Sequence, residues 1–210
     1  MNIETVVVGP LQVNCYLVWE APRQALVIDP GWEAGKILSV LERHRLSVAG
    51  YLLTHAHADH LSALAELHQA YPAFIGIHAD DLEYAFSHVN IVPPYYPPPK
   101  APAAEVSRVF RSDESWTDAG LEYRVIPTPG HSPGGVSFYF PKGQALFSGD
   151  TLFAGSVGRT DLPGGNPRIL ARSLARLATL PDETEVYPGH GPGSTIGTEK
   201  AENYFLQRSR

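Results

Sequence analysis

The chain has 210 residues, a length that fits one domain spanning residues 1–210 better than two. Its 43% hydrophobic and 18% charged residues exclude an intrinsically disordered chain, and a net charge of −6 without a run of Lys or Arg argues against nucleic acid as a partner. With no basic N-terminal segment, no apolar run long enough for a bilayer and one cysteine, Cys15, the sequence predicts a soluble, cytoplasmic protein without a membrane partner.

The first half of the chain alternates between runs rich in β-branched residues and stretches with helical periodicity. Asp29-Pro30-Gly31 ends the third run, and a later short run leads directly into the sequence THAHADH of residues 54–60. The histidine-rich sequence therefore lies on a connection between a strand and a helix. Strands are predicted over residues 3–8, 13–19, 25–28, 50–53 and 74–77, and helices over residues 33–44, 61–67 and 80–87.

The sequence PPYYPPP of residues 93–99 predicts a stiff loop, since proline lacks the amide hydrogen and fixes φ. This loop is interpreted either as a polyproline connector or as a flap that faces the substrate. Two β-rich halves, each closed by helices, predict a layered α/β fold of the α+β class with helices on the outside. In the second half, strands are predicted over residues 106–110, 121–126, 136–140 and 145–147, and helices over residues 167–178 and 198–207.

Five of the nine histidines lie in turns or beside glycine, where the backbone can approach a bound group closely. Two of them follow a glycine directly, His131 and His190, and Asp150 follows Gly149 in the same way. Three histidines and an aspartate also fall within the six residues 55–60. This density of ligand side chains indicates a metal site. The candidate ligands are His55, His57, Asp59, His60, His131, Asp150 and His190.

These candidate ligands are too many for one tetrahedral zinc ion, which usually takes three or four protein ligands. Two divalent metal ions fit better, with one carboxylate bridging them and a shared water or hydroxide. Imidazole and carboxylate suit zinc, iron and manganese alike, so the residue types do not identify the metal. A non-catalytic metal-binding protein is an alternative, and it requires closed coordination without an exchangeable water.

The order of these motifs, THAHADH at residues 54–60 followed by Gly-His, Gly-Asp and Gly-His, resembles the metallo-β-lactamase superfamily over essentially the whole chain. The resemblance implies an αββα sandwich. Asp29 resembles an aspartate that supports the site from behind the ligands, and we expect Thr54 to orient ligands together with it. The resemblance divides the ligands between two ions: one on His55, His57 and His131, a second on Asp59, His60 and His190, and Asp150 as the bridge.

The motifs SGDTLF at residues 148–153, VGRTD at 157–161 and YPGHG at 187–191 are most similar to glyoxalase II, the hydroxyacylglutathione hydrolase, and its shorter relatives. This similarity implies a dinuclear hydrolase whose partner is a small-molecule thioester such as S-(2-hydroxyacyl)glutathione. Persulfide dioxygenases share several of these motifs, and that alternative implies one iron and the oxidation of a glutathione persulfide by O₂. A nucleic-acid hydrolase of the same superfamily is disfavoured by the acidic composition.

The expected chemistry favours a thioester over an amide as substrate. A metal lowers the pKa of its bound water to roughly 7, so a metal-bound hydroxide can attack the carbonyl at neutral pH. A thiol, with a pKa of about 8.5, leaves as a thiolate without a strong acid, whereas an amide nitrogen must be protonated as it leaves. We expect Asp59 and Asp150 to take part in catalysis, Asp59 also as a proton shuttle.

Four further residues are candidates for substrate contact. Arg159 can bind a substrate carboxylate through two guanidinium nitrogens, and a structural ion pair with Asp161 is the alternative. Tyr95 and Tyr96 in the proline-rich loop and Lys200 in the last predicted helix are candidates for the same role. Cys15 lies in an alternating strand and is expected to be a small buried apolar residue.

Overall fold

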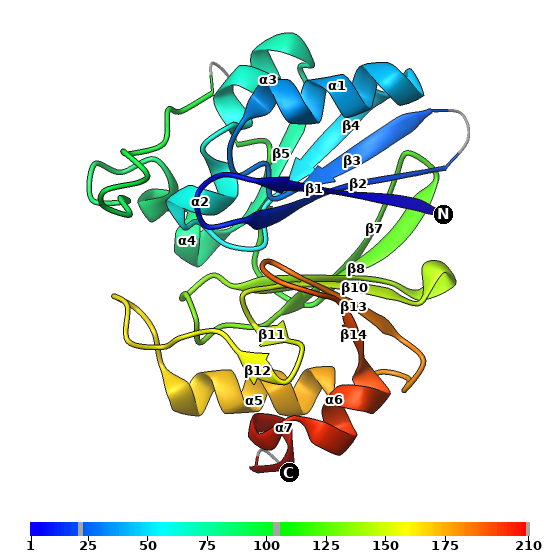
Figure 1. Cartoon of the computed structure of the whole chain (residues 1–210), viewed down its shortest axis with the longest axis vertical. Helices are drawn as coiled ribbons and strands as arrows, with labels where there is room; N and C mark the ends of the chain where they lie inside the picture. The colour runs from blue at the N-terminus through cyan, green and yellow to red at the C-terminus, as the bar shows by residue number, and fades with distance from the viewer. Residues whose placement is uncertain (21–22, 103–105, 209–210) are drawn as a thin grey trace.

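The computed structural model describes residues 1–20, 23–102 and 106–208. Two six-stranded sheets face each other in the middle of the molecule, and helices cover the outer face of each sheet (Figure 1). The layers therefore follow the order helix, sheet, sheet, helix, which confirms the expected αββα sandwich. None of the helices in these ranges combines the length and the apolar composition that a bilayer span requires.

The first sheet contains the N-terminal half of the chain, and its last four strands run parallel. Parallel strands need crossover connections, which are helical here and leave the carboxyl ends of the strands at one edge. In order, the strands are β1 (Asn2–Val8), β2 (Val13–Glu20), β3 (Gln24–Ile28), β4 (Ser47–Leu52), β5 (Phe74–His78) and β6 (Arg108–Phe110). The helices are α1 (Ala34–His44), α2 (Ala58–Leu61), α3 (Leu64–Ala70) and α4 (Ala79–Ala85).

The second sheet contains the C-terminal half and is mostly antiparallel, but three of its strands run in one direction. β13 (Glu185–Pro188) runs parallel to β10 (Ala145–Gly149). β8 (Leu121–Pro127) runs in the same direction as β10, because both are antiparallel to β9 (Val136–Phe140), which lies between them. Helices α5 (Pro167–Leu177), α6 (Ile196–Glu202) and α7 (Tyr204–Arg208) cover this sheet. Its order is β14 (Ser194–Thr195), β13 (Glu185–Pro188), β10 (Ala145–Gly149), β9 (Val136–Phe140), β8 (Leu121–Pro127) and β7 (Glu114–Asp118). A hairpin of β11 (Leu152–Phe153) and β12 (Ser156–Val157) follows β10, and a 3₁₀ turn spans Pro141–Gly143.

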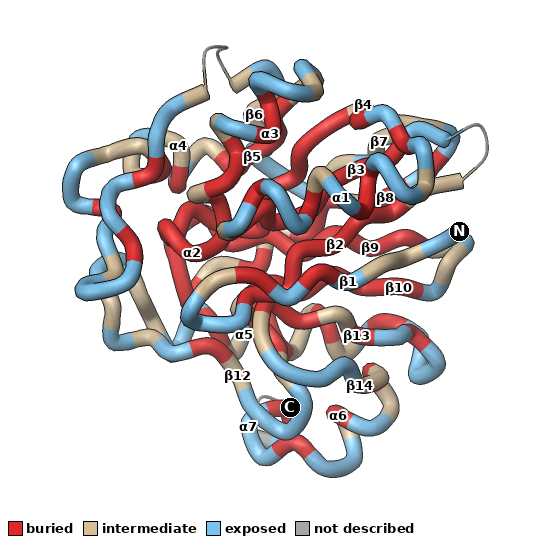
Figure 2. The backbone as a smooth tube through the Cα atoms, turned by 45° about the horizontal axis from the view of Figure 1, so that its top comes forward, coloured by how far each residue is buried: buried red, intermediate tan, exposed pale blue. Residues whose placement is uncertain are grey.

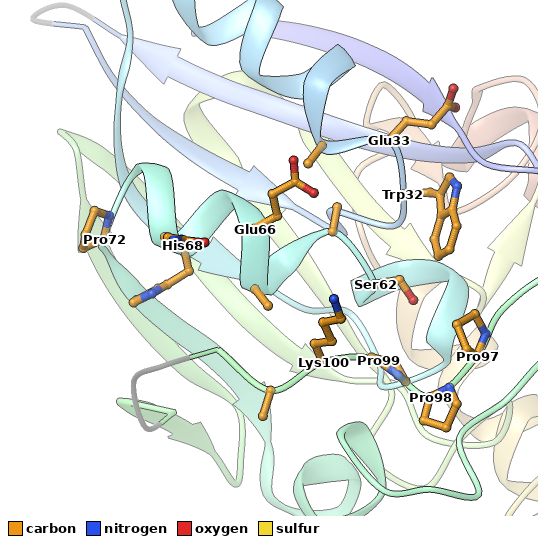
Figure 3. A pocket seen from close by; sticks show the side chains of 15 residues that line it. Trp32, Glu33, Ser62, Glu66, His68, Pro72, Pro97, Pro98, Pro99 and Lys100 are labelled. Carbon is orange, nitrogen blue, oxygen red and sulfur yellow. The ribbon is translucent and has the colours of Figure 1, made fainter.

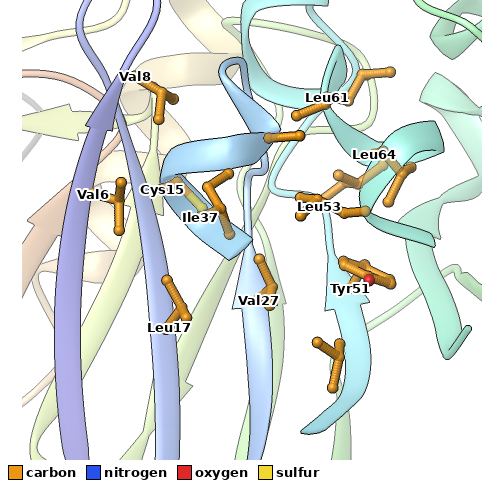
Figure 4. Packing of buried hydrophobic residues seen from close by; sticks show 14 of the residues in the cluster. Val6, Val8, Cys15, Leu17, Val27, Ile37, Tyr51, Leu53, Leu61 and Leu64 are labelled. Atoms are coloured by element: carbon orange, nitrogen blue, oxygen red, sulfur yellow. The ribbon is translucent and has the colours of Figure 1, made fainter. Parts of the chain in front are cut away.

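The middle strands of the first sheet are buried on both faces, because helices cover one face and the second sheet covers the other (Figure 2). In β2, Cys15 and Leu17 point toward the helices and pack in one cluster with Ile37 of α1 (Figure 4). The alternate residues Tyr16 and Val18 pack in a second cluster between the sheets. The period-two alternation of a strand thus serves two cores at once, and Cys15 is buried as expected.

A third hydrophobic cluster joins the second sheet to its covering helices. Leu170, Leu174 and Leu177 of α5 recur at helical spacing and form this contact with Leu146 of β10. Three clusters therefore hold the four layers together, and the loops at the strand ends are left to carry polar side chains.

Two expectations about the elements are wrong in detail. The predicted helix over residues 198–207 is two helices, α6 and α7, because Asn203 has an extended backbone and its side-chain oxygen accepts a hydrogen bond from the Phe205 amide. The predicted strand over residues 106–110 starts only at Arg108. The short strands β7, β11, β12, β13 and β14 were not among the predicted elements.

A substitution at Ile37 tests the packing of α1 on the first sheet. Ile37→Ala removes a fully buried side chain, and we expect it to lower the free energy of unfolding by about 2–5 kcal/mol. Glu42→Ala, on the exposed face of the same helix, should change it by at most about 0.5 kcal/mol. Urea unfolding of both variants measures the difference, and equal effects would contradict the packing.

Candidate metal centre

The loops that follow the carboxyl ends of the strands from both sheets converge at one edge of the sandwich. Main-chain hydrogen bonds tie these loops together: the Val136 amide donates to the Thr54 carbonyl at 2.8 Å, and the Gly189 amide donates to the Gly149 carbonyl at 2.8 Å. All of the predicted ligands lie in these loops or in the first turn that follows them. Their side chains form two neighbouring groups that share Asp150.

The three-histidine group consists of His55, His57 and His131. Each offers one ring nitrogen, and the three nitrogens lie within 4.8 Å of one another. His57 Nδ1 is 2.8 Å from His131 Nε2, while His55 Nε2 is buried and has no hydrogen-bond partner among the described residues. Three converging imidazole nitrogens, one of them an orphan, are the donor set that a divalent transition metal takes.

The mixed group consists of Asp59, His60 and His190, with α2 supplying the first two. His60 Nε2 lies 3.3 Å from His190 Nε2 and 3.8 Å from Asp59 Oδ2. His190 Nε2 lies 3.5 Å from the same carboxylate oxygen. These donors can also surround one cation, and the partial exposure of the His190 side chain, 27%, marks the open side of the centre.

Asp150 lies between the two groups. Its Oδ1 is 3.5 Å from His60 Nε2, and its Oδ2 is 3.5 Å from His131 Nε2 and 3.6 Å from His190 Nε2. Oδ1 is buried without a hydrogen-bond partner among the described residues. A buried carboxylate oxygen without a partner is costly, so the residues present fit a pair of cations that share this carboxylate.

Asp29 and Thr54 orient two of the histidines from behind. The Thr54 hydroxyl donates to Asp29 Oδ2 at 2.6 Å and so accepts from His55 Nδ1 at 3.0 Å. His60 Nδ1 donates to the same Asp29 oxygen at 3.0 Å. With their Nδ1 protons fixed in this way, His55 and His60 both turn Nε2 toward the centre. Asp29 itself has φ of 50°, a left-handed conformation that is uncommon for a residue other than glycine.

Main-chain carbonyls orient two further histidines, which sequence reasoning did not foresee. His131 Nδ1 donates to the Arg159 carbonyl at 2.8 Å, and His190 Nδ1 donates to the Leu11 carbonyl at 2.9 Å. A carbonyl only accepts, so Nε2 of each ring is left free for a metal. No residue type signals such an acceptor.

Asn14 holds the loop that carries His190. Its side-chain amide donates to the Pro188 carbonyl at 3.0 Å and to the Gly191 carbonyl at 2.9 Å. The Tyr16 hydroxyl donates to the Pro188 carbonyl at 2.6 Å. A polar residue between apolar neighbours in a buried strand is the sequence signal that could have identified Asn14.

Burial and charge give the two groups different protonation. Burial lowers the pKa of His55 and, with the nearby His131, lowers the pKa of His57 to about 4, so both rings are neutral at pH 7. Burial also opposes the charge on His60, yet Asp150, Asp59 and Asp29 raise its pKa to about 10. The pKa of Asp59 is lowered by His60 and His190 in spite of burial. Neutral imidazoles and ionised carboxylates are the forms that bind metals, so His55, His57 and Asp59 are already in the binding form, whereas His60 must lose a proton when a cation binds.

The glycine before His190 is required by close packing. A Cβ at Gly189 would overlap Asp150 Oδ1, and a Cβ at Gly158 would overlap the Asp150 carbonyl oxygen. Only glycine leaves room for Asp150 at these two positions.

Of the candidate substrate contacts, Arg159 and Tyr95 are exposed. Arg159 Nε and Nη2 each lie 2.7 Å from a carboxylate oxygen of Asp161, so the ion pair that was the alternative is present. The Tyr95 side chain is half exposed. A contact of either residue with substrate stays a prediction.

Tyr96 and Lys200 both have contacts within the protein. Tyr96 is 2% exposed and packs edge-on against Trp32 at 4.9 Å between ring centroids. A contact of Tyr96 with substrate stays a prediction. Lys200 lies on α6, in the layer that covers the outer face of the second sheet, and forms an ion pair with Asp182.

The proline-rich loop lines a cavity of about 1060 Å³ beside α3 (Figure 3). Trp32, Glu66, Pro98 and Lys100 are among the residues that surround this space, and none of the candidate ligands does so. The loop thus packs through Tyr96 on one side and faces this separate cavity on the other.

Comparisons with known proteins place the chain among metal-dependent enzymes. The sequence model of the Metallo-beta-lactamase superfamily matches residues 8–190. The hydroxyacylglutathione hydrolase GloC of Haemophilus influenzae is 34% identical over 208 residues, which cover 98% of each chain. Among solved structures, the BLEG-1 B3 metallo-beta-lactamase is 34% identical with a TM-score of 0.92, covering 98% of this chain and 99% of its own. TTHA1623 in a di-iron-bound form is 43% identical with a TM-score of 0.84, covering 97% and 100%.

Asp150→Ala tests whether the two groups share a carboxylate. The variant removes an oxygen from each group, so we expect affinity for divalent cations to fall at least about 100-fold. Asp182→Ala, which removes an exposed carboxylate, should retain the metal content of the unaltered protein. Elemental analysis after dialysis measures both, and equal metal content in the two variants would count against a shared ligand.

Proposed function

Since this chain belongs to the metallo-β-lactamase superfamily, we propose that it is a hydrolase that uses two divalent metal ions to cleave thioesters of the S-(2-hydroxyacyl)glutathione class. The ligands proposed are the three-histidine group for one ion, the mixed group for the other, and Asp150 for both. Zinc, iron and manganese all suit this donor set. The similarity to GloC over the full length of both chains supports the substrate class.

The observation that carries the proposal is the position of Asp150. Each group alone has three donors, which is enough for one cation but leaves the role of a buried carboxylate between them unexplained. Asp150 Oδ1 faces His60 and Oδ2 faces His131 and His190. A carboxylate that faces both groups fits two neighbouring cations, an arrangement common in hydrolases.

The bound ions would polarise the substrate carbonyl and lower the pKa of a water molecule to roughly 7. Asp59 stays ionised because His60 and His190 lower its pKa, so it is available as a ligand for a cation, and its role as a proton shuttle stays a prediction. The Asp29–Thr54 pair and the carbonyls of Leu11 and Arg159 hold four imidazole rings in one orientation. This fixed geometry reduces reorganisation during the reaction.

A β-lactam is the second candidate substrate, favoured by the similarity to the BLEG-1 B3 metallo-beta-lactamase. The two reactions differ in the leaving group. A thiolate leaves without protonation because thiols have a pKa of about 8.5, whereas a lactam nitrogen needs an acid. Asp59 is held ionised, which makes it a poor acid and favours the thioester.

Thioester hydrolysis is tested by free-thiol release from S-D-lactoylglutathione. We expect turnover by protein purified with its own metals, and at least about a 100-fold loss in His131→Ala. The same preparations are assayed with a β-lactam and with glutathione persulfide under O₂. Sulfite formation with one bound iron, or β-lactam cleavage without thiol release, would overturn the proposal.

Arg159 is tested as a contact for a substrate carboxylate. Arg159→Ala should raise KM about fivefold with little change in kcat, since an exposed ion pair contributes at most about 1 kcal/mol. The main-chain carbonyl that orients His131 is retained in this variant. Asp161→Ala releases the guanidinium and should leave KM unchanged or lower it. A parallel rise of KM in both variants would assign Arg159 to a structural ion pair.

A further inference from the structure

Asp81, in the first turn of α4, is a buried carboxylate outside the candidate ligands. It is 1% exposed, and among the described residues no Lys, Arg or His forms an ion pair with it. Its carboxylate oxygens accept hydrogen bonds instead. Burying such a group costs free energy, so the donors that hydrogen-bond to it indicate which part of the structure it holds in place.

The donors to Asp81 come from the two loops that supply the three-histidine group. Oδ2 accepts from the Ala56 amide at 3.0 Å and from the Ser132 hydroxyl at 2.8 Å. Oδ1 accepts from the Gly134 amide at 2.6 Å. Ala56 is the residue between His55 and His57, and Ser132 follows His131. One side chain therefore joins all three histidines through their chain neighbours.

Asn90, in the loop after α4, holds the other side of the same segment. It is 1% exposed, and its amide donates to the Ala56 carbonyl at 2.6 Å and to the Ala85 carbonyl at 2.8 Å. The amide and the carbonyl of Ala56 are thus both fixed by the region of α4. The spacing of His55 and His57 depends on this region as well as on the strand that precedes them.

Close packing leaves little room for the His131 loop to move away from α4. A Cβ at Gly134 would lie 2.6 Å from the Asp81 nitrogen and 2.7 Å from its Cγ, distances that side chains do not reach. Glycine therefore lets the two main chains approach at this point.

The mixed group is held by other contacts. His60 is oriented by Asp29 and His190 by the Leu11 carbonyl. The His60 amide donates at 2.9 Å to the carbonyl of His57, the residue before α2, so this one contact joins the mixed group to the three-histidine group. None of these hydrogen bonds involves Asp81.

We propose that Asp81 is a positioning residue that sets the geometry of the three-histidine group. It governs how tightly that group retains a divalent cation, and it does not affect the cation at the mixed group. The inference rests on the metal sites of the proposed function, but it concerns binding and is independent of the substrate. It makes the two halves of the centre separately adjustable.

The test is Asp81→Asn, which keeps the volume and replaces an accepting oxygen with an NH₂ group that faces other donors. Metal-free protein is titrated with Co²⁺ alone and followed by its visible absorption. In a His190→Ala background, where the mixed group is weakened, Asp81→Asn should raise the Kd of the remaining ion roughly 10- to 100-fold. In a His131→Ala background, it should change the Kd less than about twofold.

Asp80→Asn is the matched control, because Asp80 lies in the same helical turn with its side chain 65% exposed, and it should change neither Kd. Circular dichroism and urea unfolding of the metal-free variants test the fold. If Asp81→Asn does not fold, Ser132→Ala removes one of the three donors and must show the same selectivity with a smaller effect.

Equal weakening in both backgrounds, or no weakening in either, overturns the proposal. Thiol release by the unaltered protein is measured separately. Selective loss of Co²⁺ without thioester turnover would support the role of Asp81 and refute the proposed substrate. Thioester turnover without selective loss of Co²⁺ would support the proposed substrate and refute the role of Asp81.

Discussion

The edge of this sandwich is organised around one constraint: ionisable side chains that would be hydrated in the unfolded chain are buried against one another. Asp29, Asp59 and Asp150 face His60 from three sides and raise its pKa to about 10, even though burial acts in the opposite direction. Charges this close in a poorly hydrated site must be balanced by a proton or a cation. The centre therefore has a strong preference for positive charge before any particular metal is considered.

The fold meets this constraint because strand ends from two sheets point to the same edge. β3, β4, β8, β10 and β13 each end in a loop that contributes a ligand or a group that orients one. One of these loops has a strained backbone: Asp29 has a left-handed φ, which a glycine such as Gly149 adopts freely but other residues do not. Strain of this kind persists only where surrounding structure enforces it, and the three hydrophobic clusters of the layers provide that support.

The sequence allowed the layered fold and the clustering of the candidate ligands to be predicted, because glycine and histidine at strand ends have few other uses in such density. The groups that orient the ligands were largely missed. The carbonyls of Leu11 and Arg159 carry no information in their residue types, and Asp81 looks like an ordinary acid in the first turn of a helix. Of the short strands, β13 was missed because it pairs with β10, which is distant in the sequence, whereas β7 was missed although it forms a hairpin with the neighbouring β8.

Tyr96 shows that the burial of a side chain in a loop is also hard to predict from the sequence. In the sequence, paired tyrosines between prolines resemble an exposed aromatic flap, but only Tyr95 is exposed while Tyr96 packs on Trp32. Its neighbour Pro98 lines a cavity that none of the candidate ligands lines. Side-chain burial in a loop depends on what the loop covers, so of two adjacent residues of one type, one can face solvent while the other packs in the interior.

The similarities to GloC and to a B3 metallo-beta-lactamase raise the question of what selects the substrate in proteins with such similar folds. Two cations held as proposed would activate a water toward any carbonyl that reaches them. Selection must then come from the leaving group that the site can release and from contacts on the open side, near His190. Residues that orient ligands, such as Asp29 and Asp81, would adjust the metals without touching substrate. Arg159 has two separate contacts: its carbonyl accepts from His131, and its exposed guanidinium, the proposed contact for substrate, pairs with Asp161.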